Sequence, residues 1–254
     1  MITLSSDFGS PYPAAMKGVI KSRCDAELID VAHDFPRQDV RTAGFWLREI
    51  LPYFPPAVHL VVVDPGVGTG RAAIAIRVGE HALVGPDNGV LLPAARRLAG
   101  RDADLEVFEI EYGDPESVTF HGRDVFAPAA ADVHDVGVAR MAELSTLATG
   151  AAYEDLAFPE ADVDGAGATG EVLVVDGFGN AITNVPGEVL EGRFGERIEV
   201  DGEAAPVAPT YAAVDPGERL VTVGSHGNVE LAVNRGRGED EFGVGPGDPV
   251  RLEW

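Results

Sequence analysis

The first half of the chain alternates short apolar runs with amphipathic segments, and this alternation restricts the possible folds more than any other feature. Apolar runs rich in β-branched residues indicate strands, and apolar residues at helical spacing indicate helices. Strands are predicted at residues 1–6, 26–33, 57–64 and twice within 72–85, and helices at 14–24 and 40–51. Such an order is typical of an α/β layer architecture with a largely parallel sheet. We therefore expect an N-terminal α/β domain over residues 1–158.

The composition changes near residue 158. The segment FPEADVDGAGATG, residues 158–170, is acidic and rich in glycine, which predicts a linker at 159–169. Beyond it the apolar runs are short and are separated by Gly, Pro and Asp; they lie at 171–176, 196–200, 219–224 and 228–234. Strands of this spacing without intervening helices are typical of small all-β units. Residues 170–254 are therefore predicted to form a smaller C-terminal β-barrel domain.

The chain is strongly acidic, with 19 Lys and Arg against 42 Asp and Glu and a formal net charge of -23. Its two lysines are Lys17 and Lys21, and the acidic residues are spread along the whole length. Binding to nucleic acid or to anionic membranes needs clustered cationic side chains, so neither partner is expected. One interpretation is adaptation to concentrated salt, where counterions screen self-repulsion, and an ordinary acidic protein is the alternative.

Two further features restrict the class of protein. The single Cys24 excludes an internal disulfide framework and a cysteine-rich zinc site. No run approaches the apolar length of a membrane span, and the first ten residues, MITLSSDFGS, lack the charged and apolar regions of a signal peptide. A cytoplasmic protein is the expectation.

The turn VVVDPGVGTGR, residues 61–71, resembles a phosphate-binding loop but fits neither common template. It opens on Asp64, which would repel a phosphate, and closes on Arg71. Ligands of parallel sheets bind at the carboxyl ends of strands, and Asp7, Asp64 and GPDNG (85–89) all follow predicted strands. A plain connecting turn is the alternative to a functional site here.

Three other segments carry candidate side chains. TFHGRDVFAPAAA, residues 119–131, places His121 after two residues of apparent strand and before a predicted helix. A metal site formed by His121, Asp124, His134 and Asp135 is an alternative, but this spacing fits no common motif and no metal is predicted. DGFGNAITN (176–184) and GSHGN (224–228) combine acids, amides and glycines, and polar hairpin turns would have the same composition.

Taken in order, SDFG, DPGVGTGR, GPDNG, FHGRDVFAPAAA, DGFGNAITN and LAVNRG resemble the motifs of the S-adenosylmethionine hydroxide adenosyltransferases. These enzymes are relatives of the fluorinating and chlorinating S-adenosylmethionine enzymes, and the resemblance extends from Thr3 to about Leu252. It implies an N-terminal α/β domain, a C-terminal β-barrel and a homotrimer with active sites between subunits. The implied reaction is hydrolysis of S-adenosylmethionine to adenosine and L-methionine, with no cofactor.

The resemblance also implies roles for individual residues. Asp64, Arg71 and His121 would handle the attacking water or hydroxide. The implied substrate contacts are Asp7 with the ribose diol, Asn180 with adenine, Asp176 with the methionine ammonium, Ser225 with the methionine carboxylate beside His226, and backbone groups from Val233 to Arg235 with adenine.

Three positions separate the possible activities. Halogenating relatives carry a serine at the position of Gly122 and lack an acid at that of Asp64, so the sequence favours hydroxide over halide transfer. His226 stands where fluorinating relatives have an arginine, which makes the carboxylate contact a poorer match. A protein that senses S-adenosylmethionine or adenosine without turnover is the alternative from another class. Only the set of Asp64, Arg71 and His121 favours chemistry over binding.

Overall fold

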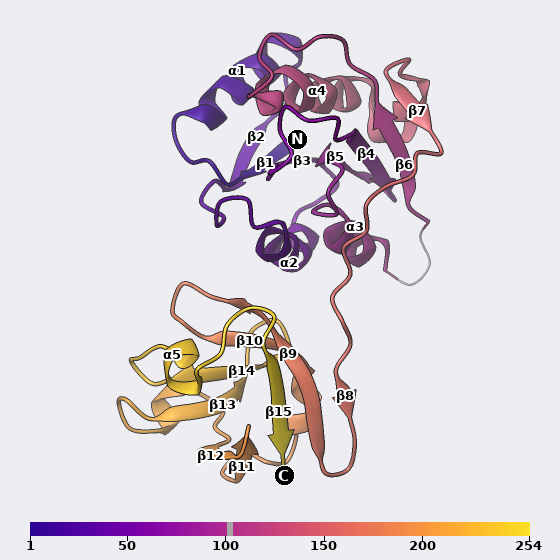
Figure 1. Cartoon of the computed structure of the whole chain (residues 1–254). Coiled ribbons are helices and arrows are strands. Elements are labelled where there is room, and N and C mark those ends of the chain that lie inside the picture. Colours follow the sequence, from indigo (N-terminus) through magenta and orange to yellow (C-terminus); the bar gives the residue numbers. More distant parts are fainter. Residues whose placement is uncertain (101–103) are drawn as a thin grey trace. The chain divides into compact units, whose positions relative to one another are not determined.

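The computed structural model describes residues 1–100 and 104–254 and divides into two compact units, Met1–Ala157 and Phe158–Trp254 (Figure 1). The first unit is built on a seven-stranded sheet with the order β2-β1-β3-β5-β4-β6-β7. Its strands are β1 (Ile2–Ser6), β2 (Leu28–Ala32), β3 (Val58–Val62), β4 (Ala73–Val78), β5 (His81–Pro86), β6 (Glu106–Ile110) and β7 (Leu147–Thr149).

Half of this sheet is parallel. Strands β2, β1, β3 and β5 pair parallel with one another, whereas the β5–β4, β4–β6 and β6–β7 pairs are antiparallel. The change of direction arises because β4 and β5 are joined by the two residues Gly79 and Glu80, and such a turn allows only an antiparallel hairpin. The α/β fold class is confirmed, and the parallel half carries the ends of β1 and β3.

Helices cover both faces of the sheet (Figure 1). The helices α1 (Tyr12–Arg23) and α4 (Ala127–Val136) lie on one face, and α2 (Val40–Ile50) and α3 (Leu92–Ala99) lie on the other. Met16 and Ala130 are fully buried in the first of the two cores, and Leu47 and Leu92 in the second. Shorter helical turns are η1 (Leu51–Tyr53), the π-helix η2 (Gly122–Phe126) and η3 (Val138–Glu143). None of the helices in the described ranges has both the length and the apolar character that crossing a bilayer requires.

The second unit is an eight-stranded antiparallel sheet that nearly closes on itself. Its strand order is β12-β11-β15-β9-β10-β14-β13, with β8 paired to β9. After β12, Val207 bridges Val221 of β13, and the Ala208 N–H donates to the Val221 carbonyl at 3.0 Å. These contacts join the two ends of the sheet, which confirms the barrel-like class. The elements are β8 (Asp162–Val163), β9 (Gly167–Val175), β10 (Ala181–Pro186), η4 (Gly187–Leu190), β11 (Arg197–Val200), β12 (Glu203–Pro206), η5 (Tyr211–Ala213), β13 (Arg219–Val223), β14 (Asn228–Val233), α5 (Gly238–Phe242) and β15 (Pro249–Glu253).

The segment expected to be a linker, 159–169, contains regular structure. Strand β8 lies inside it and pairs with β9, which already begins at Gly167. The Asp164 carboxylate accepts hydrogen bonds from the N–H groups of Ala166 (2.7 Å) and Gly167 (3.0 Å). The acidic, glycine-rich composition therefore encodes a hairpin turn, for which Asp and Gly are equally suited.

Candidate active site

The loop from Asp64 to Arg71 follows β3 and is closed by its own hydrogen bonds. Asp64 accepts from the N–H groups of Gly66 (3.1 Å, carboxylate) and Val67 (3.3 Å, carbonyl). The Thr69 hydroxyl donates to the Gly66 carbonyl at 2.6 Å and accepts from the Arg71 N–H at 3.3 Å. These bonds engage the N–H groups of Gly66, Val67 and Arg71 within the loop. The loop therefore does not present the row of free N–H groups that a phosphate cradle requires.

The Arg71 side chain folds back onto Asp64. Its Nη2 lies 2.6 Å from Asp64 Oδ2, and only 9% of the Arg71 side chain and 5% of the Asp64 side chain are exposed. Nη1 donates to the Ala72 carbonyl, and the guanidinium carbon lies 5.2 Å from the ring centroid of Phe126. An arginine held on several sides in this way is a fixed positive charge beside the carboxylate.

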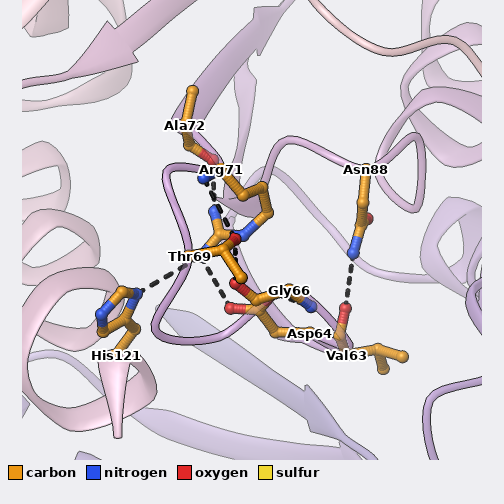
Figure 2. Close-up of polar contacts among 8 residues, drawn as sticks. All are labelled: Val63, Asp64, Gly66, Thr69, Arg71, Ala72, Asn88 and His121. Carbon is orange, nitrogen blue, oxygen red and sulfur yellow. Dashed lines mark hydrogen bonds and ion pairs between the residues drawn. The ribbon is translucent and has the colours of Figure 1, made fainter. Parts of the chain in front are cut away.

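His121 completes a group of three side chains (Figure 2). Its Nδ1 lies 3.4 Å from Arg71 Nη2, and the residue is 4% exposed. A guanidinium only donates, so Nδ1 is the acceptor and the ring proton resides on Nε2. The Tyr112 ring meets the imidazole edge-on at 5.9 Å. The structure thus brings together Asp64, Arg71 and His121 from two distant segments, although residues 119–120 form a turn and not the strand we expected.

Burial raises the pKa of Asp64 above its ordinary value, against the opposing influence of the Arg71 charge and hydrogen bond, the Gly66 N–H and the nearby His121. Desolvation penalises the charged form of a carboxyl group and makes it a stronger base. Each carboxylate oxygen keeps a second lone pair, because Oδ1 is used by Gly66 and Oδ2 by Arg71. Each oxygen of Asp64 can therefore accept one further hydrogen bond, and either can accept a proton.

Gly68 sets how closely the two segments approach. Its φ is +78°, and a Cβ at this position would lie 2.8 Å from the carbonyl oxygen of Val118, in the segment that leads to His121. Other residues disfavour this φ, and no Cβ fits so close to a backbone oxygen. Glycine is needed here so that the Asp64–Arg71 loop can pack against the His121 segment.

Asn88 is a supporting residue that the sequence did not single out individually. Its Nδ2 donates to the carbonyl of Val63, directly before Asp64, at 2.9 Å (Figure 2). The N–H of the neighbouring Asp87 donates to the Ala72 carbonyl, directly after Arg71, at 2.9 Å. GPDNG therefore holds both ends of the Asp64–Arg71 loop. Its place at a strand end was the signal that could have identified this role.

Gly122 is packed too tightly to carry a side chain without movement of its neighbours. A Cβ there would lie 3.0 Å from the sulfur of Met16, 3.2 Å from the Phe120 ring and 3.3 Å from a methyl group of Val62. A serine, as in the halogenating relatives, would have to displace one of these groups. This packing agrees with the sequence preference for hydroxide over halide.

Three of the four side chains considered as an alternative metal site have other partners, and His121 is the one beside Arg71. His134 Nε2 is 2.9 Å from the amino group of Met1. Asp124 accepts from the Ser117 N–H at 2.8 Å and forms an ion pair with Arg123. Within residues 1–100 and 104–254, no group of three or more His, Cys, Asp and Glu is arranged to hold a metal ion.

Asp7 lies at the same sheet edge as Asp64. Ser6, the last residue of β1, pairs with Val62, the last residue of β3, so both carboxylates follow the carboxyl ends of adjacent parallel strands. Asp7 Oδ2 accepts from the N–H of Gln38 at 2.7 Å. This is the edge at which ligands of such sheets bind.

The candidate residues of the second unit begin with the turn between β9 and β10. Asp176 Oδ1 accepts from the N–H groups of Phe178 (2.8 Å) and Asn180 (2.9 Å), and Oδ2 accepts from Asn180 Nδ2 (3.0 Å). Asn180 Nδ2 also donates to the Tyr211 hydroxyl at 3.3 Å. Both amide hydrogens are thus engaged within the protein, and the amide oxygen is the part of Asn180 best able to read a base.

Two residues that the sequence did not identify extend this network. The Tyr211 hydroxyl donates to Glu230 Oε2 at 2.9 Å, and Glu230 is 4% exposed. Burial raises the pKa of Glu230, and the neighbouring Asp176 charge acts in the same direction, while Tyr211 and His226 oppose it. A buried glutamate in a strand gives no recognisable sequence signal, which explains why it was missed.

The remaining predicted residues lie at the two ends of β14. Ser225 and His226 occupy the turn between β13 and β14; Ser225 is exposed and His226 half-buried. Val233, the last residue of β14, is buried. Arg235 is exposed and has a φ of +59°, which is unusual for a residue other than glycine.

Comparisons with known proteins identify relatives along nearly the whole chain. Residues 2–143 match the family model described as SAM hydroxide adenosyltransferase N-terminal domain, and residues 170–251 match the corresponding C-terminal domain. Proteins named "(R)-S-adenosyl-L-methionine hydrolase" are 44% identical in Salinispora tropica (99% of this chain, 97% of the relative) and 41% identical in Thermus thermophilus (97% of each). An uncharacterised conserved protein from Thermotoga maritima has a similar crystal structure, with a TM-score of 0.82, 35% identity and full coverage of both chains. The crystal structure of a conserved hypothetical protein from Thermus thermophilus gives a TM-score of 0.75 and 38% identity, over 99% of this chain and 98% of its own. The chain therefore belongs to the S-adenosylmethionine hydroxide adenosyltransferase family.

Proposed function

We propose that this protein hydrolyses S-adenosylmethionine at C5′ to give adenosine and L-methionine. The observation that supports this most strongly is the convergence of Asp64, Arg71 and His121 at the carboxyl edge of the sheet. Relatives at 41–44% identity carry the name of the same hydrolase. A pure binding protein would have no need of a buried carboxylate of raised basicity beside a fixed cation and an imidazole.

The reaction requires little of the protein beyond the nucleophile. C5′ of the substrate is bonded to a sulfonium, which leaves as a neutral thioether and takes the electrons of the C5′–S bond. A water oxygen forms the new C5′–O bond, and one proton of that water is lost. No leaving-group acid is needed. Positioning an oxygen in line behind C5′ and removing its hydration are the main contributions to the rate.

We assign the proton to Asp64. Its spare lone pairs and raised pKa suit it to orient the water and to accept the proton, a contribution of roughly 10²–10⁴-fold in general base catalysis. Arg71 lowers the energy of negative charge developing on the water oxygen, because it is held rigidly beside the carboxylate. His121 accepts from Arg71 through Nδ1 and so helps to hold the guanidinium beside the reacting oxygen.

The substrate contacts are part of this proposal. Asp7 would bind the ribose diol, because a carboxylate offers two acceptors to two hydroxyl donors. The contacts proposed in the second unit are Asn180 and backbone groups from Val233 to Arg235 with adenine, Asp176 with the ammonium group, and Ser225 and His226 with the carboxylate. A homotrimeric state, a cytoplasmic location and adaptation to concentrated salt are further parts of the proposal, and they rest on the resemblance and the composition.

Incubation with S-adenosylmethionine in ¹⁸O-labelled water, with and without halide, tests this function. We expect labelled adenosine and unlabelled methionine in equal amounts, irrespective of halide. Asp25→Asn is the control, because the Asp25 side chain is fully exposed. This variant should give the same products at the same rate as the wild type. A 5′-halogenated nucleoside would mean that the protein is a halogenase. Bound but unaltered substrate would mean that it is a sensor.

A further inference from the structure

His33 lies beside the Asp7 segment because of an irregularity in the sheet. It directly follows β2, the parallel neighbour of β1. The register between the two strands moves by one residue, so that Leu4 lies opposite Asp30 and Ser5 opposite Ala32. This bulge brings the residue after β2 level with the end of β1. Asp7 is the next residue after that end.

His33 holds the chain on both sides of Asp7. Its Nδ1 lies 2.7 Å from the hydroxyl oxygen of Ser6, the residue before Asp7. Its backbone carbonyl accepts from the N–H of Gly9, two residues after Asp7, at 2.8 Å. The Gln38 N–H, from the loop that follows His33, donates to the Asp7 carboxylate itself at 2.7 Å. Asp7 is therefore fixed from three directions by one short segment, 33–38.

The orientation of the His33 ring is set by an acid and a lysine. Its Nε2 lies 2.9 Å from Asp30 Oδ1, and Lys17 donates to Asp30 Oδ2 at 2.6 Å. Burial tends to raise the pKa of Asp30, but the hydrogen bonds from Lys17 and His33 outweigh it, and the pKa lies below its ordinary value. An ionised carboxylate only accepts, so His33 Nε2 carries a proton and Nδ1 accepts the Ser6 hydroxyl. One of the chain's two lysines is thus used to complete this chain of contacts.

The order Ser6, His33, Asp30 resembles a nucleophile with its base and orienting acid, but the burial of Ser6 excludes that role. Ser6 is 0% exposed and lies within the sheet, so no substrate carbonyl can reach its hydroxyl. The exposed end of the arrangement is Asp7, which is half-buried and follows the strand end. The contacts therefore act on the position of Asp7.

We propose that His33 is a positioning residue for Asp7, which holds this carboxylate in the orientation that binds a vicinal diol. Together with Ser6, Asp30 and Lys17 it makes recognition of the ribose depend on residues that do not touch the substrate. This inference rests on the proposed contact of Asp7 with the ribose.

A double-mutant cycle on nucleoside binding tests the inference. The affinities of the full-length protein for adenosine and 2′-deoxyadenosine are measured by calorimetry for the wild type, Asp7→Asn, His33→Ala and the double variant. We expect the wild type to prefer adenosine, and His33→Ala to reduce that preference by roughly tenfold, within the usual coupling of residues that share one hydrogen-bond network. In the Asp7→Asn background, His33→Ala should have no further effect on the preference. His33→Asn, whose amide oxygen can accept from Ser6, should restore part of it.

His81→Ala is the matched control. His81 is also a partly buried, hydrogen-bonded histidine, but it begins β5 at the opposite edge of the sheet. The His81→Ala variant should keep the wild-type preference for adenosine. An equal loss of affinity for both nucleosides in His33→Ala, or a further loss of preference when His33→Ala is added to Asp7→Asn, overturns the inference. If Asp7→Asn itself keeps the wild-type preference, the proposed contact of Asp7 with the ribose is what fails.

Discussion

Replacement of Gly68 by alanine tests whether the distance between the Asp64–Arg71 loop and the His121 segment controls the reaction. The added methyl group would lie 2.8 Å from the Val118 carbonyl oxygen, whereas ordinary van der Waals contact begins at 3.4 Å. The two segments must therefore separate by about 0.6 Å, unless the loop changes its conformation. Either response moves Asp64 and Arg71 relative to His121.

Two costs follow from this geometry. The φ of +78° disfavours alanine, and a strained backbone position of this kind costs about 1–3 kcal/mol. For a chain of this size that loss lowers Tm by roughly 2–4 °C per kcal/mol. A misplacement of about 1 Å at a reacting centre can reduce the rate by about 10²-fold, so a shift of half that size should reduce kcat by roughly tenfold. KM should change little, because the predicted substrate contacts lie elsewhere.

The assay compares kcat, KM and Tm with those of two control glycines. Gly70, in the same loop, has open space at its Cβ position, so Gly70→Ala should leave both kcat and Tm unchanged. Gly79 has a φ of +55° but also open space, so Gly79→Ala should lower Tm without affecting kcat. If Gly68→Ala loses stability like Gly79→Ala but keeps its kcat, the spacing of the two segments does not matter for the reaction.

Three further predictions concern pH and salt. The raised pKa of Asp64 places the acid limb of kcat above pH 3.8, because the carboxylate must be ionised to accept a proton; a limb at or below 3.8 would contradict this assignment. Burial and the charge of the neighbouring His81 lower the pKa of His59 to about 3 in the folded protein, from its ordinary value of 6.5. Between these two values His59 binds a proton in the unfolded state but not in the folded state, which favours unfolding as the pH falls. Urea unfolding should therefore show a stability loss of about 2 kcal/mol between pH 7 and 5 that His59→Gln removes; an equal loss in the variant would refute it. The net charge of -23 predicts a Tm that rises as KCl is increased to molar concentrations. A Tm that does not change with KCl would exclude adaptation to salt.

The elements with clear periodicity could be predicted from the sequence within about two residues. The run at 1–6 became β1 (Ile2–Ser6), and the helical spacing at 40–51 became α2 (Val40–Ile50). The direction of β4 was not predicted, because an apolar run indicates an extended segment and not its partner. Strand β6 was missed because the exposed Glu106 and Glu109, three positions apart, interrupt the alternation of apolar and polar residues, and β7 is too short to show any period.

The contacts of the candidate site also differ in how far the sequence could predict them. Asp64 and Arg71 share one turn, so their proximity could be expected from sequence distance alone. The approach of His121 depends on strand order and on a glycine that touches a distant carbonyl, and only the family resemblance indicated it. The roles of Asn88 and His33 depend on tertiary contacts with residues 25 and 27 positions away; the strand end before Asn88 is a local signal for its role, whereas no local pattern indicates that of His33.

The central claim is that Asp64, Arg71 and His121 act on one water molecule at C5′ of the substrate. The most direct test is the single-turnover rate of C5′–S cleavage in Asp64→Asn, measured by rapid chemical quench together with the substrate Kd. We expect a cleavage rate lowered by at least roughly 10²-fold and a Kd that stays close to that of the wild type. An unchanged cleavage rate, or a loss confined to Kd, would contradict the claim.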